Sequence, residues 1–219
     1  MDSCGCGDDF ASIFDERVAR HDRDRYHRQG PDRTTRMLLG MITARMASGM
    51  SILDIGGGIG VIDQELLRAG ADGAVLVEAS RAYLEVARQE AANVASSGRM
   101  RFVEGDFVRR AVDVEAADIV TLDRVVCCYP DVDAVVSLSA DRARRLYGLV
   151  LPRHGWHLRM ALGVVNLAYR LRRSRYRAYA HANGRIDALV AEHGLVPTAE
   201  AHTFIWRVVL YERAASVPA

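Results

Sequence analysis

The chain has 219 residues, of which 50% are hydrophobic and 26% charged, the size and balance of one globular domain with a substantial core. The formal net charge of +1 argues against nucleic acid as a partner, because no global positive field would attract phosphate. No apolar run reaches the roughly 18 residues that a membrane span needs.

Four cysteines occur in two tight pairs, Cys4 with Cys6 and Cys127 with Cys128. These spacings do not suit a disulfide framework, and a chain of this size does not need one. We therefore expect reduced thiols and a cytoplasmic location. The spacings also lack a zinc-finger pattern, so no metal site is predicted. Convergence of both pairs into a thiolate site for zinc or a thiophilic element remains an alternative.

The first fifty residues are polar and arginine-rich and then become amphipathic. Residues 8–28 carry apolar side chains at helical spacing, and a turn signal at 30–32 ends the pattern. A second amphipathic helix is predicted over 37–46. The apolar stripe of the first helix consists of Phe10, Ile13, Phe14 and Val18. Together these segments predict an N-terminal helical cover over residues 1–48.

From Ser51 onward, short apolar strands alternate with helices, a pattern typical of a parallel sheet covered on both faces. We predict strands at 52–55, 74–77, 100–103, 117–122 and 149–151, and helices at 60–68, 80–94 and 132–146. After Pro152 we predict helices at 156–171 and 186–193 and a final hairpin of strands at 195–199 and 203–211. No internal repeat or linker interrupts the chain. The prediction is a single domain, 1–219, with a core over 49–151, an insertion over 152–194 and a final strand pair over 195–219.

The most specific stretch runs from Leu53 through Asp54 and a run of glycines to Gly60. A buried strand enters a turn too tight for side chains, and a helix follows at once, so backbone N–H groups face a ligand. The dinucleotide fingerprint fails, because Val61 or Asp63 occupies its last position. Asp54 would repel a pyrophosphate but suits a cationic amino group.

Two further acidic positions follow the next two strands. Glu78 ends the second strand, where a carboxylate accepts hydrogen bonds from ribose hydroxyls. Asp106 lies just past the third strand, where a carboxylate can accept from an adenine amino group, and Phe107 can pack on the ring. The three motifs together predict a nucleoside with a charged amino-acid end.

At these residues the chain resembles the class I S-adenosylmethionine-dependent methyltransferases. The family motif acidic-x-Gly-x-Gly-x-Gly is matched by Asp54, Gly56, Gly58 and Gly60, and the stretch 118–131 looks like its fourth-strand motif. The resemblance runs from about Gly49 to Leu151. It implies an α/β, Rossmann-like, seven-stranded and mostly parallel sheet with helices on both faces, and S-adenosyl-L-methionine as methyl donor. The donor-binding residues that it implies are Asp54, Gly56, Gly57, Gly58, Gly60, Glu78, Ala79, Gly105, Asp106, Phe107, Asp123 and Arg124.

The candidate catalytic residues are His181, Tyr129 and Cys127. Many relatives have a His pair and an apolar residue before the Pro-Asp turn, whereas this chain has Cys127-Cys128-Tyr129, so a role of those histidines is not inherited. His181 lies where the family builds its acceptor pocket, and histidine is the natural base near neutral pH. Because adjacent side chains rarely share one direction, we expect at most one of the two cysteines to face the substrate. Small packing residues remain the alternative reading of both.

The acceptor pocket is expected between the N-terminal helices and the insertion. The candidate lining residues are Phe14, Tyr26, Arg153, His154 and Trp206. Residues 153–177 hold seven arginines and no acid, a composition that suits an acceptor with an acidic group, although solvated helix faces are the alternative.

The predicted function is methylation of oxygen or nitrogen on a small molecule, acidic or aromatic. A weaker similarity to the magnesium-protoporphyrin methyltransferases, based on the late insertion, the arginines and the aromatic last strand, raises esterification of a tetrapyrrole carboxylate. A thiolate-assisted sulfur or metalloid methyltransferase and a non-catalytic nucleoside-binding module stay open. Methylation of nucleic acid is disfavoured, because the charge balance gives no surface that tracks phosphates.

Overall fold

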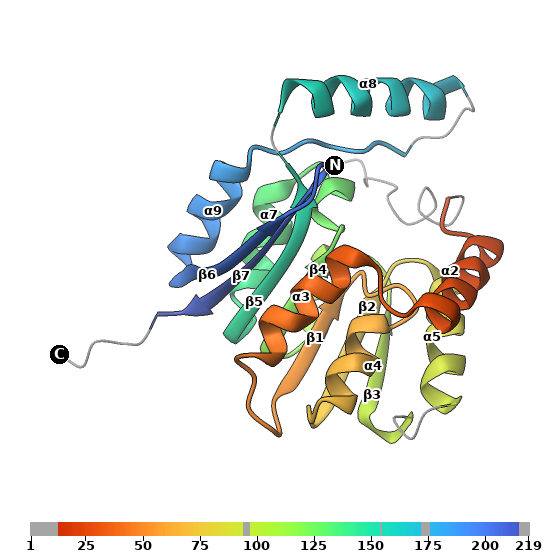
Figure 1. The fold of residues 1–219 in the computed structure, drawn as a ribbon, viewed down its shortest axis with the longest axis vertical. Coiled ribbons are helices and arrows are strands. Elements are labelled where there is room, and N and C mark those ends of the chain that lie inside the picture. Colours follow the sequence, from red (N-terminus) through yellow and green to blue (C-terminus); the bar gives the residue numbers. More distant parts are fainter. Residues whose placement is uncertain (1–12, 94–96, 154, 172–175, 215–219) are drawn as a thin grey trace.

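The computed structural model describes residues 13–93, 97–153, 155–171 and 176–214. Its centre is one seven-stranded sheet (Figure 1). The strands are β1 (Ser51–Ile55), β2 (Gly73–Glu78), β3 (Met100–Glu104), β4 (Ala117–Asp123), β5 (Ala143–Pro152), β6 (Leu195–His202) and β7 (Trp206–Arg213). Their order is β3-β2-β1-β4-β5-β7-β6, with β1 to β5 parallel and β7 antiparallel to both of its neighbours. The predicted fold class is confirmed.

Helices cover both faces of the sheet (Figure 1). They are α2 (Glu16–Gln29), α3 (Arg33–Thr43), α4 (Val61–Arg68), α5 (Arg81–Asn93), α6 (Phe107–Arg110), α7 (Val132–Ala140), α8 (Trp156–Leu171) and α9 (Asn183–Glu192). Alternation along β1 divides the core in two: Leu53 and Ile55 pack in the cluster that includes α7 and α9, and Ile52 packs with α3, α4 and α5. Among the described residues, no helix is long and apolar enough to cross a membrane.

The predicted helix over 132–146 is wrong in its second half. Helix α7 ends at Ala140, and β5 begins at Ala143 and runs for 10 residues. The apolar residues of this run do recur at helical spacing. However, β5 pairs with β4 on one side and β7 on the other, and these long-range pairings override the local pattern. The predicted strand over 149–151 is therefore the end of a longer strand.

The N-terminal helices differ in what they cover. Helix α2 is capped by Asp15, whose carboxylate accepts from the Val18 amide, so its start lies later than predicted; Phe10 lies outside the described residues. Helix α3 starts at Arg33 rather than 37, because Asp32 accepts from the amides of Thr34 and Thr35. Helix α3 packs on the sheet, whereas α2 packs against α5.

Close packing of α3 on the sheet depends on Gly148 in β5. A Cβ at this position would lie 2.8 Å from Leu38 Cδ1, and Leu38 is fully buried. The absent side chain thus lets the helix approach the strand, as is common where backbones come close.

We expect Gly148→Val to lower the free energy of unfolding by about 1–3 kcal/mol, because the added carbons overpack this contact. The matched control is Gly40→Ala in α3, where a Cβ meets nothing within 4 Å. That control should raise the free energy of unfolding by up to about 1 kcal/mol through helix propensity. Urea unfolding followed by circular dichroism measures both, and equal effects would refute the contact.

Candidate active site

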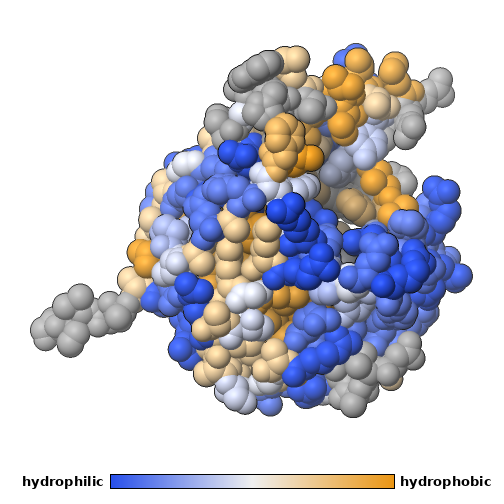
Figure 2. Space-filling view, in the orientation of Figure 1, coloured by the Kyte–Doolittle hydropathy of each residue, from blue (hydrophilic) through white to orange (hydrophobic). Residues whose placement is uncertain are grey.

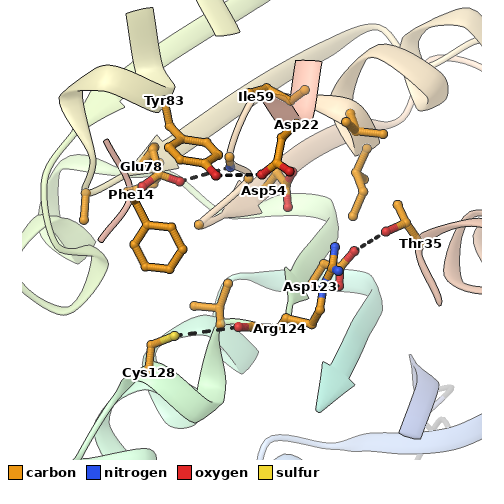
Figure 3. A pocket seen from close by; sticks show the side chains of 18 of the residues that line it. Phe14, Asp22, Thr35, Asp54, Ile59, Glu78, Tyr83, Asp123, Arg124 and Cys128 are labelled. Atoms are coloured by element: carbon orange, nitrogen blue, oxygen red, sulfur yellow. Dashed lines mark hydrogen bonds and ion pairs between the residues drawn. The ribbon is translucent and has the colours of Figure 1, made fainter. Parts of the chain in front are cut away.

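A cavity of about 420 Å³ lies at the carboxyl ends of β1, β2 and β4, where open α/β sheets bind ligands (Figure 3). The loop after β1 and the residues that end β2 and β4 form its floor. Residues of the N-terminal region and of the turn after β4 form its walls. The sheet thus brings together most of the residues that the sequence singled out.

The loop between β1 and α4 is shaped by glycine. Gly56, Gly58 and Gly60 all have positive φ, at 64°, 60° and 78°. A Cβ on Gly56 would lie 2.5 Å from Val125 Cγ2, and one on Gly57 would lie 2.4 Å from Asp54 Oδ2. Backbone alone therefore fits here, and the loop forms a cradle along the cavity floor.

Asp54 lies under this loop and is 1% exposed. Its Oδ1 accepts a hydrogen bond from Thr121 at 2.6 Å, whereas Oδ2 has no hydrogen-bond partner among the described residues. Asp63 is buried beside it. Burial and the neighbouring carboxyl raise the pKa of Asp54 well above its usual range, and burial raises the pKa of Asp63 to about 7. The floor thus holds a buried acid pair that a cationic group could neutralise.

Replacement of Asp63 by Asn should stabilise the protein in a pH-dependent way. Folding raises the pKa of Asp63 from 3.8 to about 7. Below about pH 4 the carboxyl is protonated in both the folded and the unfolded state, so its ionisation costs no stability there. The cost grows as pH rises and is complete above about pH 7, at roughly 1.4 kcal/mol per pKa unit. We therefore expect the free energy of unfolding of Asp63→Asn to exceed that of the wild type increasingly over this window. Urea unfolding at several pH values measures the difference.

The control for this measurement is Asp72→Asn, which changes an exposed carboxylate. Its difference from the wild type should stay small at every pH. A difference for Asp63→Asn that is constant with pH, or shrinks as pH rises, would contradict the buried acid pair.

Glu78 stands at the end of β2 beside the glycine loop (Figure 3). Its Oε2 accepts from the Gly58 amide at 3.0 Å and its Oε1 from the Ser80 amide at 2.7 Å. Burial raises the pKa of Glu78, and these amide hydrogen bonds oppose that rise. The carboxylate is therefore held by backbone donors in one orientation along the cavity wall, which Ala79 also lines.

The segment after β3 lies on the same wall. Gly105 and Phe107 line the cavity. Asp106 caps α6 by accepting from the Val108 amide, and the same oxygen accepts from the Tyr129 hydroxyl at 2.9 Å. Asp106 does not line the cavity itself. Its hydrogen bond holds Tyr129, which does line the cavity. Burial and Asp106 raise the pKa of Tyr129.

A network of charged side chains lies at the end of β4, beside the cavity. Arg124 forms ion pairs with Asp32 at 2.6 Å and with Asp123 at 2.9 Å, and Asp123 accepts from the Thr35 hydroxyl (Figure 3). Burial alone would raise the pKa of Asp32, but the Arg124 charge and the hydrogen bonds from Thr34 and Thr35 lower it to about 2. This network ties the start of α3 to the end of β4.

Both cysteines of the turn after β4 line the cavity. The expectation that at most one of them faces the substrate stays a prediction. The turn is the 3-10 helix η3 (Val126–Cys128), and both thiols lie near the carbonyl oxygen of Arg124.

His181 does not line this cavity. Its Nε2 lies 2.8 Å from the Tyr129 carbonyl oxygen, and its ring stacks on Tyr179 at 5.9 Å, behind the turn. Among the described residues, no histidine lines the cavity. Arg153 is exposed, donates to the Thr203 carbonyl and lies outside the lining; His154 lies outside the described residues. Of the acceptor candidates, Phe14, Tyr26 and Trp206 line the cavity.

Sequence reasoning missed several lining residues. Tyr83 of α5 donates to Asp22 of α2 at 2.6 Å, and both line the cavity, as do Arg25 and Tyr176. No local pattern marks them, because each reaches the cavity through the packing of distant elements. Asp32 had a usable signal: an Asp that precedes Thr34 and Thr35 after a proline is a helix cap.

The comparisons agree with this geometry. Residues 52–145 match the family model described as a methyltransferase domain, and no curated protein sequence matches the chain. The structure is similar to magnesium protoporphyrin IX methyltransferase from Synechocystis PCC 6803, solved with bound SAH, at 20% identity and TM-score 0.70, over 93% of this chain and 99% of that one.

Two further solved structures share the fold. An O-methyltransferase family protein from Burkholderia thailandensis matches at 16% identity and TM-score 0.68, over 94% of this chain and 63% of that one. An O-methyltransferase family 2 protein from Planctomyces limnophilus, in complex with apigenin, matches at 15% identity and TM-score 0.60, over 85% and 63%. Identities this low show a shared fold and nothing finer.

Residues 52–145 thus match a methyltransferase domain, and the whole chain shares its fold with solved methyltransferases. The methyltransferase class that the sequence motifs predict agrees with both findings.

Proposed function

We propose that the cavity binds S-adenosylmethionine through the glycine loop and passes its methyl group to a small molecule that carries a carboxylate on an aromatic or apolar body. The observation that carries the proposal is the convergence of the positive-φ glycines, Glu78 and the buried Asp54 on one cavity. The proposed setting is the reducing cytoplasm, where the cysteines stay thiols.

We call the part of the cavity formed by the glycine loop and the ends of β2 and β4 the donor half, and its residues suit S-adenosylmethionine. The glycine cradle admits backbone contact only, Asp54 offers a buried oxygen without a partner to a cationic amino group, and Glu78 can accept from ribose hydroxyls. Gly105, Asp106 and Phe107, with Ala79, are proposed for the adenine, and Asp123 and Arg124 for the floor beneath the amino-acid end. When bound, the sulfonium supplies a methyl group that is already activated. The chain must therefore chiefly align the acceptor and exclude water.

We call the part of the cavity lined by the N-terminal region and the segment after α8 the acceptor half, and aromatic side chains dominate it. Phe14 stands edge-on to Tyr83 at 5.8 Å and to Tyr176 at 6.3 Å, and Tyr176 contacts Tyr169 of α8 at 5.2 Å. Helix α8 exposes Met160, Val164, Leu167 and Leu171. Figure 2 shows hydrophobic surface in the region of α8, above a hollow in this face. Such a surface suits an apolar or aromatic body.

Among the described residues no histidine lines the cavity, so an acceptor that needs no base fits it best. Transfer to a carboxylate needs none, because a carboxylate is already ionised near neutral pH. The Tyr129 hydroxyl, whose pKa is raised by burial and by Asp106, already donates to Asp106, so it does not serve as a base. This supports a carboxylate over a phenol or an amine. Tyr129 and Cys127 are then proposed as residues that position the acceptor.

A second candidate is a tetrapyrrole carboxylate. It is supported by the likeness to magnesium protoporphyrin IX methyltransferase, which extends over nearly the whole of both chains. The exposed apolar face of α8 offers a surface for a large flat molecule.

Labelled-methyl transfer tests the acceptor class. We expect turnover with aromatic or tetrapyrrole carboxylic acids, and none with the corresponding amides, because amides lack the ionised oxygen. The products should be methyl esters, which mild alkali hydrolyses. Equal turnover of acids and amides, or an alkali-stable product, would refute carboxylate methylation.

Calorimetry with S-adenosylhomocysteine tests the donor half. Glu78→Ala should weaken binding by about 10- to 150-fold, because it removes charged hydrogen bonds to the ligand and to the glycine loop. Glu104→Ala is the matched control, since Glu104 pairs in register with Glu78 and is exposed. Its affinity should stay within about twofold of the wild type. Equal losses in both variants would show that Glu78 does not contact the donor.

A further inference from the structure

Two thiols converge at the turn after β4. Arg124 has a φ of 62°, the single positive φ found for a non-glycine residue in the part of the chain that the structure describes. From its carbonyl oxygen, Cys127 Sγ lies 3.3 Å away and Cys128 Sγ 3.8 Å away. The turn therefore brings the side chains of two adjacent residues to one point.

This thiol pair belongs to the cavity wall. Both cysteines line the cavity, and Figure 3 shows Cys128 on the wall opposite Phe14. The Tyr176 hydroxyl lies 3.2 Å from Cys128 Sγ and comes from the segment that follows α8. The cavity wall thus carries both cysteines and the Tyr176 side chain.

The two thiols differ in acidity. The hydrogen bond with Cys128 and burial raise the pKa of Cys127. The hydrogen bond from Cys127 lowers the pKa of Cys128, burial opposes this, and the Tyr176 hydroxyl adds to the lowering. Cys128 is therefore the sulfur that loses its proton first. A thiolate is the nucleophile toward soft electrophiles.

The number of sulfurs decides the class of ligand. Within the described residues, no group of three or more His, Cys, Asp or Glu side chains could hold a metal ion. Structural zinc takes four protein ligands, so a thiol pair alone does not make such a site. Arsenic(III) with one organic substituent forms two further bonds, and sulfur is its preferred partner. Two adjacent thiols match that valence.

We propose that Cys127 and Cys128 form a dithiol site in the cavity wall that binds a trivalent organoarsenical. With phenylarsine oxide, two As–S bonds form, the arsenic–oxygen bond breaks, and the oxygen leaves as water with the two thiol protons. Arsenic stays trivalent, so no oxidant or reductant is needed. The inference stands on the thiol geometry and holds whichever acceptor the enzyme methylates.

The test begins with a parent variant, Cys4→Ser with Cys6→Ser, which leaves Cys127 and Cys128 as the remaining thiols of the four in the chain. Phenylarsine oxide is added to this full-length protein, and free thiols and intact mass are measured. We expect one arsenic per chain, loss of both free thiols, and release by 2,3-dimercaptopropanol but not by an equal concentration of 2-mercaptoethanol.

Single variants then test the pair. Cys127→Ser and Cys128→Ser should each weaken arsenical binding by about 10²- to 10⁴-fold, because the second As–S bond of the parent is intramolecular. Binding of S-adenosylhomocysteine by each variant reports that the fold and the donor half are intact. Single variants that keep donor binding and bind the arsenical as tightly as the parent would overturn the proposal. A complex with one arsenic bridging two chains would also overturn it.

Discussion

The structure depends on the loop after β1, where the backbone packs so closely against neighbouring side chains that a Cβ does not fit at two of its glycines. The loop after β1 rests on Val125, on Leu76 and on the carboxylate of Asp54, so that a Cβ on Gly56 or Gly57 would collide with a neighbour. This packing fixes the loop without side chains of its own along the cavity. Glu78 holds the loop from the next strand by accepting from the Gly58 amide. The donor half of the site is thus a property of two adjacent parallel strands.

The acidic side chains beside this loop determine which ligand charge it favours. Asp54 and Asp63 are buried beside the loop and Glu78 is half-buried, and removal from water raises the pKa of each. No cation among the described residues forms an ion pair with any of the three; Arg124 serves Asp32 and Asp123 instead. Buried carboxyls without a counter-ion are costly to ionise, and a ligand with an ammonium and a sulfonium relieves that cost. The protein therefore bears a stability penalty that favours a cationic donor.

The donor half could be predicted from the sequence because it is local. The loop from Gly56 to Gly60 and the residue Gly105 follow a strand directly, and Glu78 ends one. Parallel strands bring such positions together without further information. The rest depends on packing between distant segments. Tyr83 meets Asp22 only because α2 lies on α5, and Cys127 and Cys128 share a direction only because Arg124 adopts a left-handed backbone. The long β5 was missed for the same reason, since its pairing with β7 overrides a helical pattern around Leu146.

The two halves of the cavity therefore differ in what holds them. The donor half is built from strand ends within one sheet, and its geometry follows from pairing registers that cannot shift without exposing the core. The acceptor half is joined largely by side-chain contacts: Phe14 from the N-terminal region, Tyr176 from the insertion and Cys128 from the turn after β4 meet across the cavity. Such contacts can be exchanged at little cost to the fold, because loops and surface helices tolerate substitution better than sheet cores. Substrate choice in this enzyme thus rests on the segments whose packing is least fixed by the sheet, and the chemistry of the donor on the segments that are most fixed.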